Sequence, residues 1–64
     1  MKEYYIVSIY DPWNGIFIEV EQKFDTYEGA VKYILAQDDT LEQIGICSWT
    51  DGHDLYEVTP HIEH

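Results

Sequence analysis

Arginine is absent from this 64-residue chain, and only three lysines balance thirteen aspartates and glutamates, which gives a formal net charge of -10. Arginine supplies the planar fork that grips phosphate groups and guanine edges. A chain with this balance should therefore not bind nucleic acid directly. The charge should also repel an anionic membrane surface. The class of partner that it favours is a basic protein.

Cysteine occurs once, as Cys47, and the sequence has neither zinc-type cysteine spacing nor a glycine-rich phosphate loop. A single cysteine cannot form an internal disulfide, which agrees with a reducing compartment. Lys2 and Glu3 lead into an apolar stretch that ends at Asp11, too short for a signal peptide or a membrane span. We therefore expect a cytoplasmic protein.

A deep cavity is also hard to accommodate, because residues 1–64 make a single domain with a thin core. A small-molecule pocket of about 300 Å³ or more would consume much of that core. Hydrophobic residues are 45% of the chain and aromatic residues 16%, too much for a disordered segment. The composition predicts a folded domain that binds through its surface.

Alternating apolar residues and turn signals predict the element order ββαββ. Asn14 and Gly15 predict a hairpin turn, Asp25 and Glu28 form a capping box before a helix that ends at about residue 37, and Pro60 should close the last strand. This order indicates an α+β fold, with one helix packed on one face of a single antiparallel four-stranded sheet. The predicted strands are residues 4–10, 16–24, 44–49 and 55–59.

The loop positions predict the register of both hairpins, and so which side chains face the helix. With a loop at residues 12–15, Ile9 lies opposite Ile18, Tyr10 opposite Phe17, Ser8 opposite Glu19, Val7 opposite Val20, Ile6 opposite Glu21 and Tyr4 opposite Lys23. With a loop at residues 51–54, the core-facing pairs are Trp49 with Tyr56 and Cys47 with Val58. The residues predicted on the uncovered face are Tyr4, Ile6, Tyr10, Phe17, Ile46, Glu19, Glu21 and Glu57.

This uncovered face predicts a partner-binding site. Exposed apolar patches usually mark contacts, although an antiparallel sheet often leaves one wet face with scattered aromatics. Trp13 at the hairpin tip is either a further anchor or a cover for the thin core. The predicted partner-binding residues are Tyr4, Tyr10, Trp13, Phe17, Glu19, Glu21 and Glu57.

Crowded carboxylates can imitate the phosphate array of a nucleic acid and so block a basic groove. In size and charge the chain resembles small DNA-mimic inhibitors of phages and mobile elements, although no motif matches a particular one. We therefore expect a non-enzymatic inhibitor or regulator that binds a basic protein, such as a nucleic-acid-binding protein, as a monomer or weak homodimer. One alternative is a homo-oligomeric structural module. Another is that the acidic residues only keep a small domain soluble and have no part in binding.

A metal-binding protein is the third alternative, since His53 lies between Asp51 and Asp54 in the sequence and His61 and His64 follow. Zinc needs about four convergent ligands, and these residues match no recognised spacing. Catalysis would need a nucleophile beside a base, whereas Cys47 falls within a predicted strand on the core side. We therefore expect no metal, no cofactor and no enzymatic activity.

Overall fold

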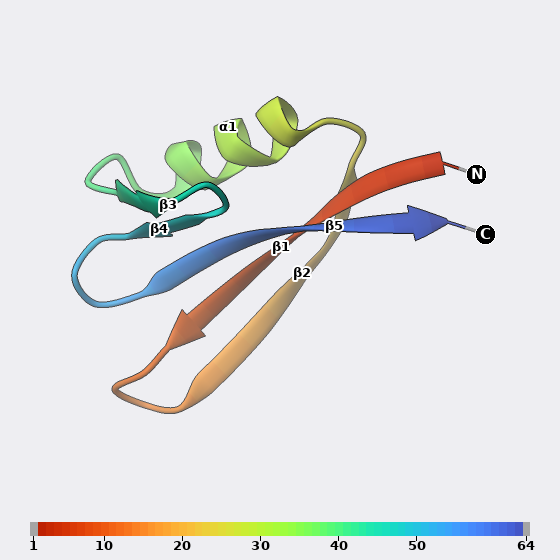
Figure 1. The fold of residues 1–64 in the computed structure, drawn as a ribbon. Coiled ribbons are helices and arrows are strands. Elements are labelled where there is room, and N and C mark those ends of the chain that lie inside the picture. The colour runs from red at the N-terminus through yellow and green to blue at the C-terminus, as the bar shows by residue number, and fades with distance from the viewer. Residues whose placement is uncertain (1, 64) are drawn as a thin grey trace.

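The computed structural model describes residues 2–63 and has an α+β fold, in which one helix packs against an antiparallel sheet (Figure 1). The sheet has five strands rather than the predicted four, in the spatial order β2-β1-β5-β4-β3. The elements are β1 (Lys2–Asp11), β2 (Ile16–Phe24), α1 (Tyr27–Gln37), β3 (Glu42–Gly45), β4 (Ser48–Thr50) and β5 (Leu55–Glu63).

The additional strand arises because the chain turns back at residues 46–47, where a continuous strand was predicted. The turn lacks the usual glycine, asparagine or proline, and its carbonyl groups are bound by side chains instead. The Gln43 amide donates to the carbonyl of Gly45 at 2.8 Å, and the Tyr27 hydroxyl donates to the carbonyl of Ile46. Cys47 therefore lies in a turn, half-buried against the core, and not in mid-strand.

The last strand continues through Pro60, which was wrongly predicted to end it. Pro60 lies opposite Tyr5 on β1. On its other side, β5 pairs with β4 only over residues 55–57. Because proline lacks an N–H group, it is tolerated where one side of a strand has no partner, and this half of β5 is such an edge.

The register of the first hairpin is as predicted near the turn and shifts further along. Ile9 lies opposite Ile18, Tyr10 opposite Phe17, and Ser8 opposite Glu19. Beyond a bulge in β2, however, Ile6 lies opposite Lys23 and Tyr5 opposite Phe24, so the predicted pairs of Ile6 with Glu21 and of Tyr4 with Lys23 are wrong. The extra residues of the bulge move every later pair along the strand. In the second hairpin, Trp49 lies opposite Tyr56, as predicted.

The core lies between α1 and one face of the sheet. Val7, Ala30 and Ile34 are fully buried, and Phe24, Trp49, Tyr56 and Val58 complete the buried cluster. The helix begins after Thr26, whose hydroxyl accepts a hydrogen bond from the Gly29 amide at 3.0 Å. Thr26, and not the predicted Asp25, is therefore the N-cap.

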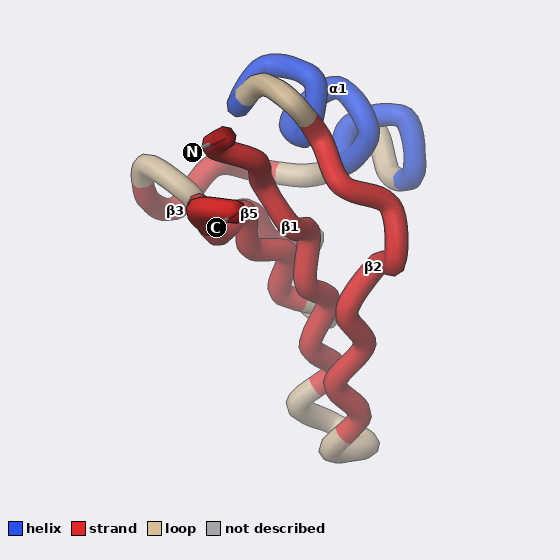
Figure 2. Tube along the Cα trace, turned by 90° about the vertical axis from the view of Figure 1, so that its right-hand side faces the viewer, coloured by secondary structure: helices blue, strands red, loops and turns tan. Residues whose placement is uncertain are grey.

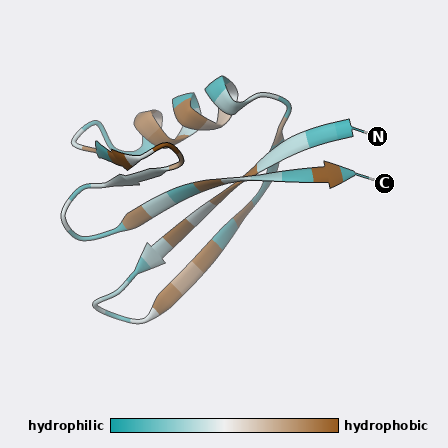
Figure 3. Cartoon of the chain, in the orientation of Figure 1, coloured by the Kyte–Doolittle hydropathy of each residue, from teal (hydrophilic) through white to brown (hydrophobic). Residues whose placement is uncertain are grey.

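The β1–β2 hairpin extends beyond the helix, and its turn lies far from α1 (Figure 2). We call residues 10–18 the hairpin arm. Ile18 was predicted to face the helix, but its side chain is 52% exposed because α1 does not reach this part of β2. Hydrophobic residues follow one another along the β2 half of the arm (Figure 3). The arm is thus an apolar projection that the core does not use.

Candidate partner-binding surface at the hairpin arm

The hairpin arm carries five of the nine large hydrophobic residues that are exposed within residues 2–63. Tyr10 is 39% exposed, Phe17 63% and Trp13 74%. Tyr10 and Phe17 lie directly opposite each other on neighbouring strands, on the face away from the helix. Neither of them folds beneath α1. The arm therefore exposes three aromatic side chains to solvent, two of them directly opposite each other on neighbouring strands.

Cross-strand register places an acidic row beside this aromatic pair. Phe17 and Tyr10 lie side by side on β2 and β1, with Leu55 next to Tyr10 on β5, and we call the two rings the aromatic row. Two residues further along each strand, Glu19, Ser8 and Glu57 lie side by side on the same face. We call the two glutamates, which flank Ser8, the acidic row. Both glutamates are exposed, so carboxylates border the aromatic row on a sheet face that no helix covers.

The other predicted site residues lie apart from these rows. The Tyr4 ring is half-buried, stacks on His61 with 5.4 Å between ring centroids, and has the Lys23 ammonium group 4.7 Å above it. Glu21 is exposed but lies in the β2 bulge. Ile6 is only 7% exposed, between Lys23 and Thr59, so its prediction as an uncovered residue was wrong.

The three lysines all lie away from the arm. The Lys2 ammonium group is 3.5 Å from the Asp25 carboxylate, Lys23 covers Tyr4, and Lys32 is on the helix. Lys23 lies opposite Ile6, four residues from Tyr10 along β1, which is roughly 13 Å of strand. The charges around the arm are therefore all acidic, apart from the titratable His53.

Asp11 fixes the tip of the arm. Its carboxylate accepts hydrogen bonds from the side-chain amide of Asn14 at 2.7 Å and from the backbone amides of Trp13 at 3.0 Å and Asn14 at 3.3 Å. The hydrogen bond from the Asn14 side chain is the main reason why the pKa of Asp11 is lowered. Gly15 completes the turn with φ at +67°, a conformation that other residues rarely adopt. Trp13 is thus held in an ordered loop.

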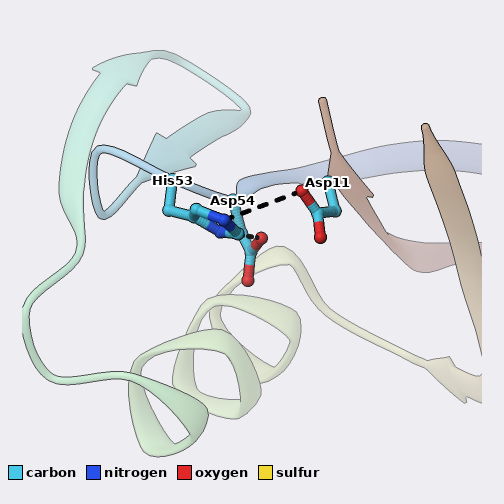
Figure 4. Close-up of side chains that lie close together, drawn as sticks. All are labelled: Asp11, His53 and Asp54. Atoms are coloured by element: carbon cyan, nitrogen blue, oxygen red, sulfur yellow. Dashed lines mark hydrogen bonds and ion pairs between the residues drawn. The ribbon is translucent and has the colours of Figure 1, made fainter. Parts of the chain in front are cut away.

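The loop between β4 and β5 packs against the arm through His53 (Figure 4). The imidazole Nδ1 lies 2.8 Å from the Asp54 carboxylate, and Nε2 lies 3.8 Å from the Asp11 carboxylate. The hydrogen bond with Asp54 is the main cause of a raised pKa at His53, and the charge of Asp11 acts in the same direction.

Asp51 organises the same loop. Its carboxylate accepts hydrogen bonds from the backbone amides of His53 and Asp54, both at 2.8 Å. The hydrogen bonds from these amides stabilise the charged form of Asp51 and help to lower its pKa to about 2. Asp51 therefore remains charged throughout the neutral range. Its carboxylate helps to keep His53 beside the arm.

Asp11, His53 and Asp54 have ligand atoms within 4.8 Å of one another, the one such group among residues 2–63. The metal set considered from the sequence does not assemble: His61 lies against Tyr4 at the far end of β5, and His64 lies outside the described residues. Asp11 was missed because it is distant from His53 in sequence. Three ligands, of which His53 is exposed and the two aspartates are half-buried, fall short of the closed four-ligand shell of a structural zinc site.

A groove of about 420 Å³ lies between α1 and the β3–β4 hairpin. The sequence did not indicate it, since it depends on the turn that separates β3 from β4. It is distinct from the arm, and Lys32 and Glu28 place one charge of each sign at its wall. Its lining residues are Tyr27, Glu28, Val31, Lys32, Leu35, Gln43 and Trp49.

Comparisons of the chain with models of protein families, with curated proteins and with solved structures found no match. Among residues 2–63, the structure has no helix with the length and apolar character needed to cross a membrane.

Proposed function

We propose that this chain is a non-enzymatic domain that binds a basic protein and inhibits or regulates it as a DNA mimic. The observation that carries the proposal is the placement of the aromatic row beside the acidic row on a sheet face without a covering helix. Together the two rows provide an apolar anchor and a border of negative charge. These are the complementary features that a basic protein surface requires.

The aromatic row supplies the anchor of the proposed interface. Aromatic side chains bury large areas at little cost in conformational entropy, and they dominate the binding energy of many interfaces. Tyr10 and Phe17 lie opposite each other, so one pocket or ridge of a partner can contact both. Exposed rings add nothing to the solubility of a chain that already carries a net charge of -10, and this supports a binding role.

The acidic row and the neighbouring loops supply the charge. Glu19 and Glu57 lie on either side of Ser8, two strand spacings apart, which is roughly 10 Å. Asp11, Asp51 and Asp54 extend the negative charge toward the tip of the arm. A protein groove shaped for nucleic acid is lined with cations that attract such an array, and occupancy by this domain would exclude the nucleic acid.

Affinity capture with matched variants tests this function. The immobilised wild-type chain is incubated with extract of its source cells at low salt, and bound protein is eluted with a salt gradient or with duplex DNA. A combined Tyr10→Ser and Phe17→Ser variant removes both rings from exposed positions. Ile46→Ser serves as the control, because Ile46 is 82% exposed and lies in the turn between β3 and β4, away from the arm.

The proposal expects a basic protein that elutes as salt rises, is displaced by DNA, and is retained by the control but not by the double variant. Screening of charge attraction over about 10 Å at moderate ionic strength is the reason for the salt dependence. Addition of the wild-type chain should also reduce nucleic-acid binding by the captured protein. A partner that binds equally well at high salt, or that is retained by the double variant, would contradict the proposal.

A further inference from the structure

We infer that the partner contributes an extended, basic segment that adds to the sheet as a new strand along the edge of β2. The inference rests on the proposed function, because it takes the basic partner as given and names the element that it presents. In this arrangement β2 lies between β1 and the added strand. Backbone hydrogen bonds to β2 hold the segment, and the side chains of β2 select it.

The two edges of the sheet differ in length and regularity. β2 forms one edge with nine residues, whereas β3 forms the other with only four and a register shift beside Gly45. In an antiparallel pair, alternate residues of an edge strand direct their N–H and C=O groups away from the partner strand. The part of β2 before its bulge, residues 16–19, pairs with β1 in regular register. The free backbone groups of this part therefore lie along the outer edge of the hairpin arm.

The side chains of this edge determine which segment fits. Ile16 and Ile18 are exposed on the side of the sheet that faces the helix, and the helix does not reach them. Phe17 and Glu19 are exposed on the other side. A segment in which apolar residues alternate with arginine matches both sides. Its apolar residues would cover the isoleucines, while its arginines pair with Glu19 and stack on the Phe17 ring.

A second copy of this chain fits the edge poorly. Each copy carries a net charge of -10, and pairing of two β2 strands would bring Glu19 and Glu21 of both copies together. Charged side chains on edge strands commonly block such self-association. The same carboxylates attract a basic segment. Charge thus selects a heterologous strand over a second copy.

The test uses the full chain, labelled with ¹⁵N, and a capped peptide of about six residues in which arginine alternates with valine. Binding is followed by NMR, and hydrogen exchange is measured for each amide of β2. We expect slower exchange at alternate amides of residues 16–19. A second peptide carries N-methyl groups on the alternate residues whose N–H groups would face β2. It keeps the side chains and the charge but lacks those donors, and it should bind roughly tenfold more weakly or worse.

Two charge-reversal variants locate the site. Glu19→Lys lies on the β2 edge and Glu42→Lys on the β3 edge, and both are exposed and change the net charge equally. We expect Glu19→Lys to weaken peptide binding several-fold more than Glu42→Lys. Equal loss in the two variants would indicate general attraction to a negative body and would overturn strand addition.

The remaining outcomes separate this inference from the proposed function. Equal affinity for the methylated and unmethylated peptides overturns strand addition, as does the absence of binding by either, while capture of a salt-sensitive partner on the arm would still support the proposed function. Protection of the β2 amides without peptide, together with a doubled mass in solution, would assign the edge to a second copy. That result would overturn the inference in favour of a homo-oligomer.

Discussion

The imidazole of His53 lies nearly parallel to the indole of Trp13, with 6.2 Å between the ring centroids and 13° between the ring planes. Through this stack, the β4–β5 loop contacts the tip of the hairpin arm. Asp11 and Asp54 flank the same imidazole, and Asp51 adds to the negative potential around it. The contact is therefore sensitive to the protonation of a single side chain.

The first prediction concerns the pH dependence of this contact. The hydrogen bond with Asp54 and the charge of Asp11 raise the pKa of His53 above its ordinary value of about 6.5. A group with a raised pKa in the folded state contributes stability that is complete below its unfolded pKa and is lost as pH rises through its folded pKa. His53→Gln should therefore lower the melting temperature more at about pH 5 than at about pH 8.

Thermal melts followed by circular dichroism at the two pH values measure this difference. NMR titration of the His53 ring gives its pKa directly, and Asp54→Asn should lower that pKa because it removes the charged hydrogen-bond partner. A ring that titrates at or below the ordinary value in the wild-type chain would contradict the prediction.

The second prediction distinguishes the observed N-cap from the one that the sequence suggested. Thr26→Ala removes the hydroxyl that accepts the Gly29 amide and should reduce the free energy of unfolding by about 1 kcal/mol. Asp25→Ala removes only an exposed ion pair with Lys2 and should change it by a few tenths of a kcal/mol. Chemical denaturation of both variants gives the comparison. A larger loss in Asp25→Ala would restore Asp25 as the cap.

The third prediction concerns the thin core. Ile34 is fully buried, and Ile34→Ala should cost about 2–5 kcal/mol through lost burial and a residual cavity. Domains of this size have a net stability of about 3–5 kcal/mol at most, so this variant should be largely unfolded at room temperature. Ile46→Ala, at an exposed turn, should change stability by less than about 0.5 kcal/mol. Circular dichroism and urea denaturation separate the two cases, and an Ile34→Ala chain that folds normally would refute this account.

The fourth prediction concerns salt. With thirteen acidic residues and three lysines on one small body, repulsion between carboxylates opposes folding, and salt screens it. We expect the melting temperature to rise by several degrees between low and moderate ionic strength, where about 1 kcal/mol corresponds to roughly 4–8 °C. Scanning calorimetry at increasing sodium chloride concentration measures this. A decrease in melting temperature would show that attractive ion pairs outweigh the repulsion.

Local signals predicted much of the fold. The bounds of β2 and the end of α1 follow from clean alternation, helical spacing and strong turn residues. The turn that separates β3 from β4 has no such signal, because Tyr27 reaches it from the helix and Gln43 reaches it from the strand before. The effect of Pro60 was predicted wrongly, because a proline is tolerated within β5 only where β4 does not pair with it, and the sequence does not show how far β4 extends along β5.

The candidate surface was predictable only near a turn. The opposition of Tyr10 and Phe17 follows from the Asn-Gly loop, since the loop fixes the first pairs of the hairpin. Apolar and polar residues alternate through β2 without a break at the bulge. The sequence therefore could not show that the pairing shifts there, or which residues surround Tyr4 and Ile6. The approach of His53 to Asp11 depends on the pairing of β5 with β1, which joins distant parts of the chain.

β5 joins two otherwise separate hairpins. β1 and β4 each pair with β5, so the five strands form one sheet only because Leu55–Glu63 lies between them. β5 thus connects the two hairpins, and the β1–β2 hairpin pairs with no other strand until β5 has been added to the sheet. Folding must wait for this long-range pairing, and a cleavage in the loop at residues 51–54 would leave β5 held to the rest of the sheet by hydrogen bonds and packing alone.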